Sequence, residues 1–288
     1  MVMGGDAVSR LHVSRGCWVP ELKGRTVIVT GAGRLRSIGR AVALEFARQG
    51  TNVVLTGTGR HPDTFPAEER EIGWRDIESV ADEIRGFGAE ALPLVVDVSD
   101  PEAVQAMVDR AVDRFGSVDV LINNAAAGRG GDRVKVVDLP LSEWRKVFRI
   151  NVEGTLLASQ AVARRLIAQG RGGCIVNIAS MISRMAPPAT AAYSASKSAV
   201  STFSRIMALE LAEHRIRVNA VLPGAIDTAR VADIEDAARW ASVVKSITPL
   251  GHAGSGMEIA YFCVYLCSDM AAWITGQDLA VDGGATWR

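Results

Sequence analysis

The sequence carries no excess of charge of either sign, because 32 Lys and Arg residues balance 32 Asp and Glu residues. A chain without net charge has no global electrostatic field with which to hold nucleic acid or an anionic membrane, although a local basic patch remains open. We therefore expect a small molecule as the partner, with no nucleic acid and no membrane.

Cysteine is scarce as well, since four residues are spread over 288 positions and do not crowd into a disulfide framework. That distribution is typical of a reducing compartment. Cys263 and Cys267 lie one helical turn apart, but no His or further Cys stands nearby, which favours buried apolar thiols over a metal pair. We expect no metal site.

Long apolar runs are missing too. Nowhere do about 18 uncharged apolar residues follow one another, and the amino-terminal segment lacks the apolar stretch of a signal peptide. A cytoplasmic location is the expectation.

The chain also has no internal repeat and no Ser/Pro linker, which indicates a flexible leader over residues 1–21 followed by one domain over residues 22–288.

What is present is a regular alternation of short β-branched apolar runs with longer amphipathic segments. The runs predict strands over 26–30, 52–56, 91–96, 119–122, 174–178, 217–222 and 278–281. The amphipathic segments predict helices over 38–49, 74–87, 101–115, 141–169, 191–213 and 257–267. Uninterrupted apolar strands are typical of a parallel sheet covered on both faces. The predicted fold class is α/β, a single-domain, doubly wound, Rossmann-like parallel sheet of about seven strands.

Two stretches look like insertions into this pattern. Residues 57–73 hold charged pairs and two prolines with little apolar periodicity, which predicts a long surface loop after the second strand. Residues 229–251 follow the sixth strand and are amphipathic. They fit a substrate lid and an ordinary surface helix equally well.

The first strand runs into a glycine-rich turn, Thr30-Gly31-Ala32-Gly33-Arg34-Leu35-Arg36-Ser37-Ile38-Gly39, and a helix follows at once. Such a turn lets the backbone approach a pyrophosphate, to which the helix amino terminus offers N–H donors. Asp97 and Asn124 follow the third and fourth strands, where ligands bind in open α/β sheets. Asp97 is placed to accept from an adenine amino group, whereas Asn124 is also explained by a tie between neighbouring strands.

The strongest chemical pattern joins Ser180, Tyr193 and Lys197, with Asn151 upstream. Tyr193 and Lys197 are four residues apart on a predicted helix and so share one face. The ammonium would lower the tyrosine pKa from about 10 and make the phenol a usable proton donor and acceptor. Ser180 ends the fifth strand, and its hydroxyl could hold a substrate oxygen. By itself, however, the Tyr/Lys pair also fits the solvent-exposed face of an ordinary amphipathic helix.

Together these pieces resemble the short-chain dehydrogenase/reductase family over essentially residues 22–287. The resemblance also includes Asn123-Asn124-Ala125, Asn151-Val152-Glu153-Gly154, Tyr193-Ser194-Ala195-Ser196-Lys197, Pro223-Gly224, Thr275-Gly276-Gln277 and Val281-Asp282-Gly283-Gly284. The family implies a redox enzyme that uses NAD(P) and a small carbonyl or alcohol substrate, and it implies a homotetramer.

The resemblance also implies roles for single residues. Tyr193 would be the general acid/base, Ser180 would position the substrate oxygen, Lys197 would bind the nicotinamide ribose, and Asn151 would hold a water in the proton relay. Ile226 and Thr228 match positions that contact the nicotinamide carboxamide. The full set of expected cofactor-binding residues is Gly31, Gly33, Arg36, Ser37, Ile38, Gly39, Thr58, Arg60, Asp97, Val98, Asn124, Tyr193, Lys197, Pro223, Gly224, Ile226 and Thr228.

The glycine-rich turn departs from the family's usual spacing, because Gly39 comes two residues late and Ser37 stands where the middle glycine would be. A longer turn resembles the enoyl-reductase branch, whose substrate is an alkene conjugated to a carbonyl. That branch places its tyrosine and lysine farther apart, so the spacing here favours carbonyl and alcohol chemistry. An enoyl reductase and a non-catalytic NAD(P)-sensing protein remain the alternatives.

The sequence predicts a preference for NADP(H) over NAD(H). Enzymes that prefer NAD place an acid at the end of the second strand, and here Gly57, Thr58 and Gly59 follow that strand instead. Arg36 stands where NADP-preferring relatives carry a basic residue, and Arg60 is placed to reach the same region. An arginine fork pairs well with a 2′-phosphate.

Overall fold

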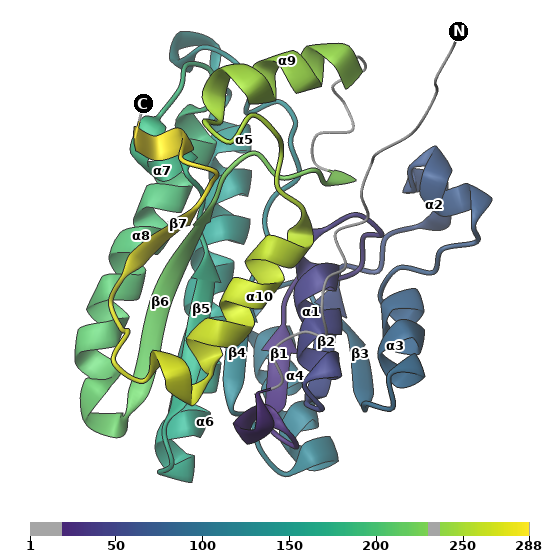
Figure 1. Ribbon diagram of the computed structural model, residues 1–288, viewed down its shortest axis with the longest axis vertical. Helices are drawn as coiled ribbons and strands as arrows, with labels where there is room; N and C mark the ends of the chain where they lie inside the picture. The colour runs from purple at the N-terminus through teal and green to yellow at the C-terminus, as the bar shows by residue number, and fades with distance from the viewer. Residues whose placement is uncertain (1–18, 230–236, 288) are drawn as a thin grey trace, which may run out of the picture.

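The computed structural model describes residues 19–229 and 237–287, and within these ranges the strands form one seven-stranded parallel sheet (Figure 1). The strand order is β3-β2-β1-β4-β5-β6-β7, so the chain winds outward in both directions from β1 and β4. The expected doubly wound α/β fold is confirmed. A sheet of this topology brings the carboxyl ends of β1 and β4 together at the switch point, where ligands bind in such folds.

The strands lie within one or two residues of the predicted runs. Their bounds are β1 Thr26–Val29, β2 Asn52–Gly57, β3 Ala91–Val95, β4 Val120–Asn123, β5 Gly173–Ile178, β6 Ile216–Pro223 and β7 Asp278–Val281. Side chains of the central strands β1, β4 and β5 are almost entirely buried, as expected for strands that helices cover on both sides.

Helices cover the two faces of the sheet. One face packs against α1 (Ile38–Arg48), α3 (Ile77–Gly86) and α10 (Gly256–Cys267). The other face packs against α4 (Pro101–Phe115), α6 (Gly154–Gln169) and α8 (Ala191–Leu211). Shorter helices are α2 (Ala67–Glu71), α5 (Leu141–Phe148), α7 (Ile182–Met185) and α9 (Ala237–Ile247). The 3₁₀ segments are Pro20–Leu22, Pro62–Thr64, Val136–Asp138, Ala212–His214, Asp269–Ala271 and Ala285–Trp287.

Helix ends follow local sequence signals. Asp100 caps α4 by accepting from the backbone N–H groups of Glu102 and Ala103, and Pro101 opens the helix. Ser255 and Glu258 form a capping box at the start of α10. These caps satisfy backbone donors that the first helical turn leaves without intrahelical partners.

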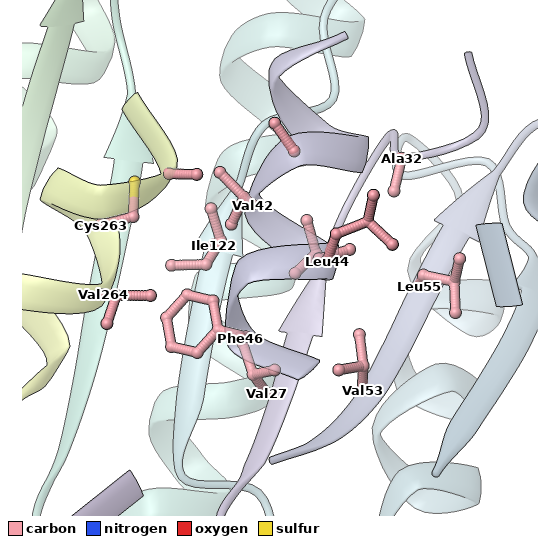
Figure 2. Close-up of a cluster of buried hydrophobic side chains, with 14 of the residues drawn as sticks. Val27, Ala32, Val42, Leu44, Phe46, Val53, Leu55, Ile122, Cys263 and Val264 are labelled. Atoms are coloured by element: carbon pink, nitrogen blue, oxygen red, sulfur yellow. The ribbon is translucent and has the colours of Figure 1, made fainter. Parts of the chain in front are cut away.

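The larger core cluster lies between the sheet and the layer of α1 and α10 (Figure 2). Phe46 of α1 is fully buried there, beside Val264 of α10 and below Ile122 of β4. Cys263 of α10 belongs to the same cluster, so the expectation that this thiol is a buried core residue is confirmed. Burial of one such aromatic side chain contributes about 1.5–3 kcal/mol through the hydrophobic effect alone.

A buried chain of amides and hydroxyls runs along one face of the sheet, from α6 through β4 and β5 to α8. Asn123 of β4 and Asn177 of β5 are paired in register, and the Asn123 amide donates to the Asn177 side-chain oxygen at 2.8 Å. Asn123 also donates to the Ser159 hydroxyl of α6 at 2.9 Å, and Asn177 donates to the Ser204 hydroxyl of α8 at 2.8 Å. These hydrogen bonds therefore link β4 and β5 to α6 and α8.

Two predicted elements differ in the structure. The helix expected over 141–169 is divided by a π-helical segment, Arg149–Glu153, because the side chain of Asn151 bonds to neighbouring elements within that turn. The insertion at 57–73 is not a free surface loop: it forms α2 and buries Phe65 and Glu69 against the rest of the domain.

Some expectations fall partly outside the described residues. The leader predicted over 1–21 is described only from residue 19, and the segment 229–251 is described at 229 and from 237 onward, where it forms α9. Across ranges 19–229 and 237–287, no helix is long and apolar enough to cross a membrane.

Candidate active site

The glycine-rich turn after β1 lies against the loop after β4. Gly31 adopts a φ of +69°, and a Cβ built on it would lie 2.8 Å from the Cα of Ala125. The Thr30 hydroxyl accepts from the backbone N–H groups of Asn124 and Ala125, at 3.0 Å each. Only glycine fits such a close backbone approach at a positive φ.

Helix α1 begins directly behind this turn. Ser37 is its N-cap, and its hydroxyl accepts from the Arg40 backbone N–H at 3.1 Å. A Cβ on Gly39 would lie 2.5 Å from the Asn124 side-chain nitrogen, so this position also needs glycine. The first turn of α1 thus offers N–H donors and the positive end of a helix dipole to an anionic ligand.

Asn124 holds the turn in place. Its side-chain amide donates to the backbone carbonyls of Thr30 and Gly31, at 2.9 Å each. The structure therefore brings Asn124 to the predicted site as a tie between β1 and β4. Its donors are used by the protein backbone, which favours the second of the two sequence interpretations.

The cradle fits the dinucleotide that the family implies. Gly33 has no side chain that would displace the Asp76 carboxylate, because a Cβ there would fall 1.7 Å from its Oδ1. The glycines of the turn and the amino terminus of α1 would hold the pyrophosphate. The buried carboxylate of Asp76 beside Gly33 supplies an acceptor at the same edge of the sheet.

The arginines expected at the adenosine ribose are engaged with carboxylates. Arg36 pairs with Glu68 at 3.0 Å and with Asp227 at 3.1 Å. Arg60 pairs with Glu69 at 2.8 Å and with Asp76 at 3.0 Å. Two of these acids, Glu68 and Glu69, belong to the inserted segment, and the sequence pattern did not place them beside the arginines. Contact of the arginines with a 2′-phosphate stays a prediction. Thr58 lies exposed on the same stretch.

Tyr193 and Lys197 lie one turn apart near the start of α8, and both are buried. The Lys197 ammonium donates to the Ile178 carbonyl at the end of β5, at 2.6 Å, and lies 5.9 Å from the centroid of the Tyr193 ring. Ser180 follows β5 by two residues, and its hydroxyl accepts from the Ile182 backbone N–H at 3.3 Å. The end of β5 therefore positions both the lysine head group and the serine.

Asn151 occupies the π-helical segment and is fully buried. Its side-chain oxygen accepts from the Ala127 backbone N–H at 2.8 Å, and its amide donates to the Ser196 hydroxyl at 2.9 Å. Asn151 thus joins the loop after β4 to the helix that carries Tyr193. A water relay through this residue stays a prediction.

Sequence reasoning missed Arg133. Its guanidinium carbon lies 4.5 Å from the centroid of the Tyr193 ring, and the side chain is mostly buried. Asp132 pairs with it at 3.3 Å and is itself buried. The sequence shows Arg133 only as a basic residue in the loop after the fourth strand. Because that loop matches no fixed motif, its contact with the tyrosine could not be predicted.

Asp97 and Val98 come after β3. The Ser99 hydroxyl and backbone N–H donate to Asp97 Oδ1, at 2.7 and 2.9 Å, and hold the pKa of that carboxyl below its ordinary value. Val98 is buried and packs against Gly154, where a Cβ would lie 2.6 Å from its side chain. Asp97 is exposed and keeps the position expected for an adenine contact, whereas Val98 has a packing role at the start of α6.

The loop after β6 closes on the glycine-rich turn. Gly224 approaches Asp282 so closely that a Cβ would lie 2.5 Å from its Cα, which explains the glycine after Pro223. Ile226 is buried and forms a bridge with Gly254. The Ala229 backbone N–H donates to the Arg36 carbonyl at 2.8 Å. Thr228 is therefore carried by a loop that spans the two halves of the site.

An apolar groove of about 520 Å³ opens beside the start of α8. Val136 and Val137 line one side, and Ala186, Pro187 and Ala191 line the other. Its lower edge reaches Ser194, the neighbour of Tyr193. The groove lies between residues 183–190 and the loop after β4.

Comparisons with known proteins agree with this geometry. A family model described as enoyl-(acyl carrier protein) reductase matches residues 31–286. An L-rhamnose 1-dehydrogenase (NAD(P)(+)) of Azotobacter vinelandii is 38% identical over 264 residues, which cover 90% of this chain and 96% of the relative. An NADP-dependent (R)-specific alcohol dehydrogenase of Lentilactobacillus kefiri is 35% identical, with 92% and 98% covered.

Solved structures give the same result. A short-chain type dehydrogenase/reductase from Mycobacterium marinum matches with a TM-score of 0.78 and 33% identity, over 93% of this chain and 97% of that one. A 7α-hydroxysteroid dehydrogenase complexed with NADH and 7-oxo glycochenodeoxycholic acid matches with a TM-score of 0.79 and 33% identity, over 92% and 95%. The chain belongs to the short-chain dehydrogenase/reductase family of oxidoreductases.

Proposed function

We propose that the protein is an NAD(P)-dependent oxidoreductase that interconverts a ketone or aldehyde and an alcohol. The observation that carries this proposal is the buried pair of Tyr193 and Lys197, set one turn apart on α8 beside Ser180 at the end of β5. The cofactor, when bound, supplies or accepts the hydride, and the protein supplies position and electrostatics.

Each side chain has one task in this reaction. The Tyr193 phenol gives its proton to the substrate oxygen during reduction and takes it back during oxidation. The Ser180 hydroxyl donates to the same oxygen and fixes its position. The cations of Lys197 and Arg133 both lie close to the Tyr193 ring, and each favours the phenolate form of the side chain.

Carbonyl chemistry is favoured over the two alternatives by the same residues. The matching family model is described as an enoyl reductase, so reduction of a conjugated alkene is the second candidate. The four-residue spacing of Tyr193 and Lys197 and the curated alcohol and sugar dehydrogenases among the relatives support the first candidate. A cofactor sensor would have no physical need for Asn151, Ser180, Tyr193 and Lys197 together.

The test is a panel assay that follows the absorbance of the reduced cofactor. Ketones, aldehydes and a conjugated enoyl thioester are offered with NADH and NADPH, and alcohols and sugars with NAD⁺ and NADP⁺. Turnover of a carbonyl or alcohol that Tyr193→Phe abolishes supports the proposal. Turnover of the enoyl thioester alone favours the second candidate, and cofactor binding without any turnover favours the sensor.

Cofactor choice, assembly and location complete the proposal. The preference for NADP(H) stays a prediction from the sequence, and the ion pairs of Arg36 and Arg60 oppose it.

A homotetramer is supported by exposed apolar side chains on α8, among them Leu209, and by the exposed Trp273. Sedimentation that shows only monomer at micromolar concentration would contradict assembly. A cytoplasmic location stays a prediction.

A further inference from the structure

Asp76 occupies an unusual place beside the cofactor cradle. It stands directly before α3 with φ 55° and ψ −128°, a conformation that residues other than glycine rarely adopt. Its side chain does not cap α3 by a hydrogen bond. The carboxylate lies against Gly33 of the glycine-rich turn and Gly57 at the end of β2.

The carboxylate lies where two glycines leave room. A Cβ on Gly33 would fall 1.7 Å from Oδ1, and a Cβ on Gly57, the last residue of β2, would lie 3.4 Å from Oδ2. Asp76 therefore fills the corner between the glycine-rich turn and the end of β2. This is the corner at which dinucleotide-binding folds place an acid against the adenosine ribose.

The hydrogen-bonding capacity of this buried carboxylate is not used up. Oδ1 accepts from Arg60 at 3.0 Å, but Oδ2 is buried and has no hydrogen-bond partner among residues 19–229 and 237–287. Leaving a buried acceptor unpaired destabilises the protein, and more so for a charged group. The carboxylate therefore retains an acceptor oxygen that no donor of the described residues uses.

The inserted segment holds this acid in place. Glu69 of α2 is fully buried, accepts from the Leu35 backbone N–H of the turn at 2.9 Å, and pairs with Arg60. The Trp74 indole donates to the Gly33 carbonyl at 2.7 Å. The insertion therefore packs against the glycine-rich turn, and Asp76 follows three residues after its end.

We propose that Asp76 accepts a hydrogen bond from the 2′-hydroxyl of the cofactor's adenosine ribose, replaces the acid missing at the end of β2, and selects NAD(H) over NADP(H). The inference rests on the proposed function, because it requires a nicotinamide dinucleotide in the cradle. It reverses the cofactor preference expected from the sequence.

The surrounding charges support the same selection. Arg60 is shared by two buried carboxylates, those of Glu69 and Asp76, which leaves this group with one net negative charge. The Arg60 guanidinium also lies 4.5 Å from the centroid of the Phe65 ring. A 2′-phosphate would enter a corner where acids outnumber the arginine, and repulsion between like charges at short range weakens its binding.

The experiment measures binding of ligands without nicotinamide, so it does not depend on turnover. Dissociation constants of ADP-ribose and 2′-phospho-ADP-ribose are determined by calorimetry for the wild-type protein and for Asp76→Asn. We expect the wild type to bind ADP-ribose at least about tenfold more tightly, and Asp76→Asn to reduce this ratio at least about tenfold, since a hydrogen bond to a charged group contributes about 1.5–3 kcal/mol and each 1.4 kcal/mol is tenfold.

Two further variants keep the result decisive. Asp76→Gly accepts the backbone conformation without strain, so it reports the loss of the carboxylate even if Asp76→Asn folds poorly. Asp82→Asn removes the same charge from an exposed position on α3, where the acid pairs with Arg75 and Arg85, and should leave the ratio unchanged.

Three outcomes overturn the inference while the proposed function stands: tighter binding of 2′-phospho-ADP-ribose by the wild type, an unchanged ratio in both Asp76 variants, or an equal change in Asp82→Asn. A wild-type protein that binds neither ligand contradicts the proposed function as well, and the inference falls with it.

Discussion

The guanidinium of Arg133 lies over the face of the Tyr193 ring, 4.5 Å from its centroid, and Lys197 lies 5.9 Å from the same centroid. Two cations from different elements therefore flank one phenol. Each favours the phenolate electrostatically, and a mostly buried position strengthens the effect because little water screens it. We therefore expect the loop after β4 to contribute to the acid/base chemistry proposed for Tyr193.

Replacing Arg133 tests this contribution. Arg133→Met should move the pH at which alcohol oxidation reaches half its maximal kcat/KM to a higher value, because removal of a cation makes the phenolate less favourable. Arg133→Lys should restore part of the change. The measurement is the pH profile of kcat/KM for the wild type and both variants. Arg129→Gln, in the exposed part of the same loop, is the control. A profile in Arg133→Met that coincides with the wild type would show that the arginine has only a structural role.

Tyr193→Phe should keep the affinity for the cofactor within a few fold and lower turnover by about 10²–10⁴, the range for loss of a general acid/base. The phenyl ring preserves the packing on α8, and only the transferable proton is lost. Calorimetric titration with the cofactor and steady-state kinetics with the substrate found in the panel give the two quantities. Near-native turnover would disprove the assigned role.

The pKa of Asp97 provides a prediction about pH. Hydrogen bonds from Ser99 lower it in the folded protein, so this carboxyl stabilises the fold above its unfolded pKa, and the contribution is lost as the pH falls through the lower folded value. Ser99→Ala should raise the Asp97 pKa toward its ordinary value, as followed by carbon NMR of the carboxyl.

Asp282 serves as the internal control in the same spectra. Burial acts to raise its pKa, and hydrogen bonds from the Thr286 hydroxyl and nearby backbone N–H groups outweigh burial and lower it. Its titration should be the same in the wild type and in Ser99→Ala. An Asp97 titration that also stays the same would mean that Ser99 is not the cause of the shift.

Phe46→Ala should lower the free energy of unfolding by about 3–5 kcal/mol, because it removes a fully buried ring and leaves a cavity between α1 and α10. Urea denaturation gives the value. Phe87→Ala is the matched control, since Phe87 is half exposed and its ring lies against the Arg48 guanidinium. Equal losses in the two variants would contradict the packing shown in Figure 2.

The strands and most helices could be predicted because their signals are local. Runs of β-branched residues and amphipathic periodicity fix an element from its own side chains, and Asp100 with Pro101 marks the start of α4 from two neighbouring positions. The same holds for Tyr193 and Lys197, whose proximity follows from helical spacing alone.

The remainder depended on contacts between distant residues. Residues 57–73 have little apolar pattern, so the burial of Glu69 could not be seen without its partners Leu35 and Arg60. Asp76 reaches the end of β2 only because α2 folds back on the turn, and no spacing rule places an acid 19 residues after Gly57 in that corner. The π-helical turn around Asn151 likewise follows from bonds to Ala127 and Ser196.

The hydrogen bonds through Asn123 and Asn177 affect the position at which α8 docks on the sheet. The hydroxyl partner of Asn177 on α8, Ser204, lies eleven residues beyond Tyr193, about three helical turns away. A helix docked one residue out of place would leave these buried groups unmatched, at about 1–3 kcal/mol for each. The amides and their hydroxyl partners therefore disfavour near-native dockings that apolar side chains would tolerate. The position of Tyr193 thus depends on a polar contact about three turns further along α8.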